Sequence, residues 1–80
     1  MSVSAENELL DLIAAEAVID RSILTPDARL DSLGIASIDM VSIVYAVEKR
    51  FKVEIRDEDL ADLETVSDLT RALGDILRKS

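Results

Sequence analysis

Apolar residues recur at intervals of three and four through residues 37 to 51, and this period constrains the fold more than any other feature. Residues three or four apart share one face of an α-helix. Ser37 and Asp39 suit the start of such a helix, because serine is a strong cap and an early carboxylate favours the positive end of the helix dipole. We therefore predict a helix over residues 37 to 51. Two apolar stripes lie on different faces of it, one of Ile43, Val44, Val47 and Phe51, the other of Ile38, Val41 and Tyr45.

Three other segments carry helical signals. The first has apolar residues spaced by three and four behind an acidic opening turn, and the last two each follow a residue that can cap a helix. The predicted helices lie at residues 4 to 19, at 57 to 63 with Asp57 as the cap, and at 66 to 78 with Thr65 as the cap. We expect an all-α fold, a small bundle of three main helices plus one short helix.

Residues 20 to 36 break the period and contain Pro26 and Gly34. They predict a long loop between the first two main helices, with a single turn near residues 27 to 33. Loops of this length inside a small domain are usually functional or disordered. The isolated apolar residues in this loop predict that it packs down on the helices.

The chain has 80 residues, which predicts a single domain over residues 1 to 80. It contains no cysteine and no histidine, so disulfides, thiolate metal sites and Ser-His or Cys-His pairs are excluded. No nucleophile has an obvious base, and we expect that the protein is not an enzyme. The acidic residues do not follow the spacing of an EF-hand loop, and no metal site is predicted.

The net charge of −8 would repel nucleic-acid backbones and anionic membranes, and it would attract basic partner surfaces. No apolar run approaches the ~20 residues of a membrane span. The first residues lack the basic and apolar regions of a secretory signal. We expect a cytoplasmic monomer that binds no nucleic acid.

Two surface features leave alternatives open. The stripe beginning at Ile38 is either covered by the long loop or exposed for docking partners. The acidic segment after Phe51 is either an ordinary solvated surface or a patch that steers basic partners.

The stretch before the second main helix reads Leu33-Gly34-Ile35-Ala36-Ser37-Ile38. It resembles the Leu-Gly-x-Asp-Ser-Leu motif of acyl carrier proteins, and the likeness continues downstream without a gap. It covers essentially the whole chain, weakly before residue 20. The matching downstream positions are Val41, Ile43-Val44, Val47-Glu48, Phe51, Glu54-Ile55, Asp57-Glu58, Leu63, Thr65-Val66 and Leu69.

This resemblance implies that a phosphopantetheinyl transferase attaches a 4′-phosphopantetheine arm from coenzyme A to Ser37. The arm would hold acyl groups as thioesters for enzymes of fatty-acid, lipid or polyketide-type biosynthesis. Acyl-loading and acyl-using enzymes with basic docking surfaces are the implied partners. The residues expected to bind them are Ile38, Asp39, Val41, Ser42, Tyr45, Glu48, Asp57 and Glu58.

A second serine competes for the attachment site. Asp31-Ser32-Leu33 spells the family's Asp-Ser-Leu tripeptide more faithfully than the stretch around Ser37 does. However, Gly34 would then fall where the first helical turn should run. Moving the site by five residues, which is not a whole number of turns, would also rotate the apolar stripes about the axis. Ser37 is the predicted site, while Ser32 and an unmodified chain remain as alternatives.

The sequence departs from the family at several positions. Ala36 replaces the usual Asp, Ser42 and Lys49 replace positions that are often acidic, and Tyr45 replaces an apolar residue. These differences imply a specialised stand-alone carrier whose cargo stays open. An aminoacyl or D-alanyl carrier is one alternative. The other is an unmodified interaction module that acts as an assembly subunit.

Overall fold

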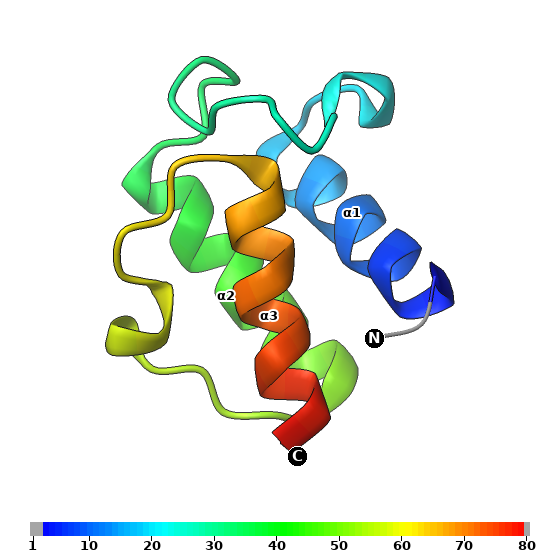
Figure 1. Ribbon diagram of the computed structural model, residues 1–80, viewed down its shortest axis with the longest axis vertical. Helices are drawn as coiled ribbons and strands as arrows, with labels where there is room; N and C mark the ends of the chain where they lie inside the picture. The colour runs from blue at the N-terminus through cyan, green and yellow to red at the C-terminus, as the bar shows by residue number, and fades with distance from the viewer. Residues whose placement is uncertain (1–2, 80) are drawn as a thin grey trace.

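The computed structural model describes residues 3–79, in which three α-helices and two short 3-10 helices are joined by loops (Figure 1). Within that range one isolated β-bridge is the sole β-structure, so the predicted all-α bundle is confirmed. No helix among these residues is long and apolar enough to cross a membrane. The elements are α1 (Val3–Ala17), η1 (Arg21–Ile23), α2 (Ser37–Phe51), η2 (Asp57–Leu60) and α3 (Val66–Lys79).

Helix α2 has the predicted bounds but a different start. Ala36 occupies the cap position, so the prediction that Ser37 caps the helix is wrong, and Ser37 is the first helical residue. Alanine has no side-chain acceptor, and the cap is completed from one side only. The Asp39 carboxylate accepts a hydrogen bond from the Ala36 N–H at 3.1 Å. At the other end Lys52 adopts the left-handed conformation, with φ 56°, and its N–H bonds back to Glu48.

The other helix ends differ by a few residues from the predicted ones. Helix α1 ends at Ala17 rather than at residue 19, because Val18 turns into the left-handed region at φ 56°. The predicted helix over residues 57 to 63 is the 3-10 helix η2 and stops at Leu60. Helix α3 runs to Lys79, one residue past the predicted end, and Thr65 caps it by accepting the Asp68 N–H at 3.2 Å.

The core is aliphatic and lies where α1 packs against α2 and α3. The stripe of α2 that contains Ile43 and Val47 faces this core, and both side chains are completely buried. The other stripe faces away from it. Ile38, Val41 and Tyr45 are 76%, 68% and 59% exposed, so the alternative in which the loop covers them is wrong.

The long loop packs on the bundle, as predicted, by burying Leu24, Leu30 and Ile35. Its middle also pairs with the segment that leads into α3, which the chain order alone does not predict. Three backbone hydrogen bonds of 2.9 Å form this pairing of residues 26–30 with residues 64–67; they run from Leu30 N–H to Glu64 O, from Val66 N–H to Ala28 O and from Ser67 N–H to Pro26 O. In Figure 1 the two segments meet above the helices.

Candidate functional site

Ser37 lies at the surface immediately after a well-anchored turn. The N–H groups of Gly34 and Ile35 bond to the carbonyl oxygens of Asp31 and Leu30 at 3.2 and 3.1 Å, and the Ile35 side chain is buried. Gly34 has φ 76°, a conformation that costs little only for glycine. The backbone is therefore held in place up to Ile35, and Ser37 follows as the exposed first residue of α2.

Two surface hollows meet at Ser37. The larger, of about 380 Å³, follows α2 toward η2, and the smaller, of about 280 Å³, lies against the long loop. Ser37 and Met40 line both of them. The larger hollow is completed by Val41, Val44, Tyr45, Glu48, Asp57 and Leu60, and the smaller by Leu30, Asp31, Ile35, Ala36 and Leu63. A group attached to the Ser37 hydroxyl thus has room on either side.

The start of α2 also favours a negative charge at Ser37. The first N–H groups of a helix have no intrahelical acceptor, and the helix dipole adds a partial positive charge there. Ala36 provides no side-chain acceptor for them. An exposed hydroxyl, room on both sides and helix N–H groups without an intrahelical acceptor together fit a phosphodiester-linked group at Ser37.

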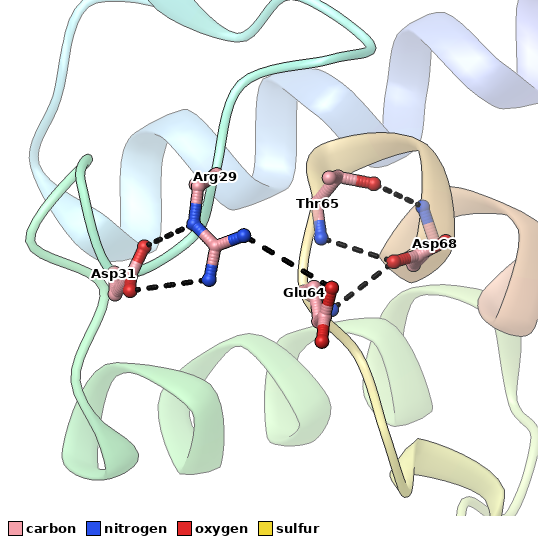
Figure 2. Close-up of polar contacts among 5 residues, drawn as sticks. All are labelled: Arg29, Asp31, Glu64, Thr65 and Asp68. Carbon is pink, nitrogen blue, oxygen red and sulfur yellow. Dashed lines mark hydrogen bonds and ion pairs between the residues drawn. The ribbon is translucent and has the colours of Figure 1, made fainter.

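A polar network supports the loop that carries this site (Figure 2). The Arg29 guanidinium bonds to the Asp31 carboxylate at 3.2 Å and lies 4.0 Å from the Glu64 carboxylate. The hydrogen bond from Arg29 holds the pKa of Asp31 below its ordinary value. On the other side of the pairing, the Asp68 carboxylate accepts hydrogen bonds from the N–H groups of Glu64 and Thr65, both at 3.1 Å. These bonds lower the pKa of Asp68. Arg29, Asp31 and Glu64 are exposed, so each ion pair among them contributes little to stability.

The competing serine, Ser32, lies in a different setting. It is exposed within a turn at residues 30–34 rather than at the start of a helix. It lines neither of the hollows beside Ser37. Its position offers no helix terminus to a phosphate group.

The residues predicted to bind partners divide into two groups. Ile38, Val41, Tyr45, Asp57 and Glu58 are exposed on α2 and η2. Asp39, Ser42 and Glu48 are half-buried. The carboxylate of Asp39 is bonded to the Ala36 N–H, and that of Glu48 accepts the Ile55 N–H at 2.9 Å. The structure therefore commits both acidic side chains of α2 to internal hydrogen bonds.

Sequence reasoning missed three residues of this region. Met40 lines both hollows, and its place one helical turn after Ser37 was a signal that could have identified it. Leu60 lines the larger hollow from η2, and its position depends on how the segment after α2 folds back. Arg29 gave no signal, because its two carboxylate partners come from different parts of the chain.

The structure is a small helical domain with an exposed serine at the first residue of its second α-helix. A family model described as a phosphopantetheine attachment site matches residues 7–73, and the chain belongs to this family. The chain is also 42% identical, over 71 residues, to an acyl carrier protein of Syntrophobacter fumaroxidans; the match covers 86% of this chain and 88% of that protein. The family's cofactor is covalently attached 4′-phosphopantetheine. It is a family of carriers, so the prediction that the chain is not an enzyme is confirmed.

Proposed function

We propose that the protein carries acyl groups as thioesters on a 4′-phosphopantetheine arm bound to Ser37. The observation that supports this most directly is the exposed Ser37 hydroxyl at the first residue of α2, between two hollows. Ser37 also lies within residues 7–73, the part of the chain that the family model matches. The arm supplies a terminal thiol, which this cysteine-free chain lacks.

The role of the chain in its own modification is that of a nucleophile. The Ser37 oxygen attacks the β-phosphate of coenzyme A, forms a phosphodiester and releases the adenosine bisphosphate portion. The hydroxyl proton goes to a base of the phosphopantetheinyl transferase, since this chain has no histidine, the side chain that most readily accepts a proton near neutral pH. The N–H groups of the first turn of α2, which have no intrahelical acceptor, stabilise the negative charge of the phosphodiester.

The larger hollow supports an acyl cargo. Met40, Val44 and Leu60 give it apolar walls, while Tyr45 and Asp57 place polar groups at its lining. An apolar chain held against the first three side chains is partly removed from water, which is favourable in proportion to its buried area. This favours acyl over aminoacyl or D-alanyl cargo, and it is compatible with fatty-acid, lipid or polyketide-type biosynthesis.

We propose that the transferase and the acyl-loading and acyl-using enzymes dock on the exposed side of α2 and η2. Asp57 and Glu58 are exposed there and offer charge to the basic docking surfaces predicted for these partners. The cytoplasmic location, the monomeric state and a single carrier domain over residues 1 to 80 stay predictions.

Intact-mass spectrometry tests the attachment. Incubation of the purified chain with coenzyme A, Mg²⁺ and a broad-specificity transferase is expected to add one arm, roughly 340 Da. The Ser37→Ala variant is expected to gain no mass, whereas the matched Ser32→Ala variant gains the full amount. A gain that survives Ser37→Ala and disappears in Ser32→Ala would show that Ser32 carries the arm and would contradict the proposal.

The experiment also addresses the unmodified interaction module, which the loss of Asp at position 36 favours. If several transferases add no mass to a folded protein, the carrier function is contradicted. A stable complex that forms equally well with wild type and Ser37→Ala would then identify an assembly subunit.

A further inference from the structure

The solvent-facing side of α2 is not acidic, although the whole chain has a net charge of −8. Both acidic side chains of this helix, Asp39 and Glu48, are half-buried and bonded to backbone N–H groups. Arg50 is exposed but paired with Glu8 at 3.1 Å. The exposed residues of α2 are Ser37, Ile38, Val41, Tyr45, Lys49 and Arg50.

Four of these residues form one continuous strip, Ile38, Val41, Tyr45 and Lys49, which we call the α2 face. The spacings of three, four and four place them on one side of the helix. Three members are apolar or aromatic and largely exposed, and the fourth is a cation. The Lys49 Nζ lies 5.3 Å from the centre of the Tyr45 ring, a cation–π distance. Among residues 3–79, Lys49 has no carboxylate within ion-pair distance.

A partner that covers the α2 face must remove water from Tyr45 and from the Lys49 ammonium group together. Desolvating an ammonium group is costly unless an opposite charge meets it. A basic surface would leave this cation unpaired and add repulsion at the same place. Lys49 therefore disfavours partners that need an acidic helix for docking, and it favours partners that place an opposite charge beside it.

We infer that the α2 face docks an acyl-using enzyme whose surface is apolar opposite Ile38, Val41 and Tyr45 and places a carboxylate opposite Lys49. This inference rests on the proposed carrier function. Basic groups of the same enzyme fit the acidic edge of η2, at Asp57 and Glu58, so the docking surface is split by charge.

The split also sets the orientation of the docked enzyme. Lys49 follows Ser37 by twelve residues on the same helix, which corresponds to about 18 Å along the axis. One carboxylate on Lys49 and apolar contact along the strip fix both the direction and the register of the enzyme relative to Ser37. The enzyme's active site is thereby held at a constant distance from the attachment point.

Photo-crosslinking followed by charge exchange tests the inference. Benzoylphenylalanine replaces Tyr45 in the full-length carrier, expressed in its own cells, and the crosslinked enzyme peptides are sequenced. Capture alone does not support the inference. The purified enzyme is then assayed with the loaded wild-type carrier and with Lys49→Glu. We expect Lys49→Glu to raise KM about tenfold with little change in kcat, a loss of about 1.4 kcal/mol in binding. Replacing the facing enzyme carboxylate by lysine is expected to restore KM.

Lys79→Glu is the matched control, because it makes the same charge change at an exposed lysine of a different helix, α3. It is expected to change KM less than about twofold. Equal effects of the two variants, a lower KM for Lys49→Glu, lysine or arginine opposite residue 49, or no crosslink from position 45 would each overturn the inference. The mass gain at Ser37 is measured first for every variant. A gain without the Lys49 effect contradicts only this inference, whereas no gain in the wild-type protein contradicts the carrier function.

Discussion

The backbone N–H of Leu30 donates to the carbonyl oxygen of Glu64 at 2.9 Å, although the two residues lie far apart in the chain. The carbonyl oxygen of Leu30 in turn accepts the N–H of Ile35 at 3.1 Å, close to Ser37. The position of Ser37, the proposed attachment site, is therefore tied to the segment that enters α3. A change in that segment can alter the site without contacting it.

Two isoleucines on α2 separate stability from docking. Ile43 is completely buried and Ile38 is 76% exposed, so the same substitution removes core packing at one position only. Ile43→Ala is expected to lower the free energy of unfolding by about 2–5 kcal/mol, and Ile38→Ala to change it by less than about 0.5 kcal/mol. Urea denaturation measures both. Similar losses for the two variants would contradict the assigned faces of α2.

Val18 is expected to be replaceable with a gain in stability. It is 87% exposed and adopts φ 56°, a conformation that is unfavourable for a β-branched residue and easy for glycine. Val18→Gly should raise the free energy of unfolding by about 1 kcal/mol. Ala15→Gly, at an exposed position within α1, should lower it by about 1 kcal/mol. Thermal unfolding of the pair is the measurement, and equal signs would refute the prediction.

The incomplete cap of α2 predicts a second stabilising substitution. Ala36 cannot accept a hydrogen bond from the first turn, whereas an asparagine oxygen there can reach the N–H of Asp39. Ala36→Asn should raise the free energy of unfolding by about 1 kcal/mol. The control is Ala36→Val, which adds volume without an acceptor. If both variants behave alike in urea denaturation, the cap is not the cause.

The pH dependence of stability should include a contribution from Asp68. Hydrogen bonds from the N–H groups of Glu64 and Thr65 lower its pKa in the folded state below the ordinary value of 3.8. A lowered folded pKa stabilises the protein above the unfolded pKa, and this stabilisation is lost as the pH falls through the folded value. The difference in stability between wild type and Asp68→Asn should therefore be constant near neutral pH and shrink below 3.8.

Urea titrations from neutral pH to about pH 3 measure that difference, in which the other carboxylates largely cancel. Asp57→Asn is a suitable control, because Asp57 is an exposed aspartate outside this network. A pH-independent difference for Asp68→Asn would show that the backbone hydrogen bonds do not depend on its charge.

The bounds of α2 and the presence of two apolar stripes on different faces followed from local periodicity, which one segment carries by itself. Periodicity left open whether the second stripe is exposed, because that depends on where the long loop packs. The pairing of residues 26–30 with residues 64–67 did not follow from periodicity, because it depends on contacts between distant segments. The hydrogen bond from the Ile55 N–H to the Glu48 carboxylate spans only seven residues, but it could not be predicted either, because it depends on how the chain turns after α2. As a result the sequence predicted Glu48 as a partner-binding charge, whereas the fold uses it to hold the chain after α2. The docking roles of the exposed residues stay predictions.

Tyr45 has an optical consequence. The chain contains one tyrosine and no tryptophan, so its near-ultraviolet absorption and emission are dominated by a single ring. That ring is 59% exposed on the α2 face, beneath the Lys49 ammonium group. Any partner without tryptophan that covers this face will change the emission of the unlabelled protein. The molecule therefore contains a natural fluorophore at the place where its contacts are expected.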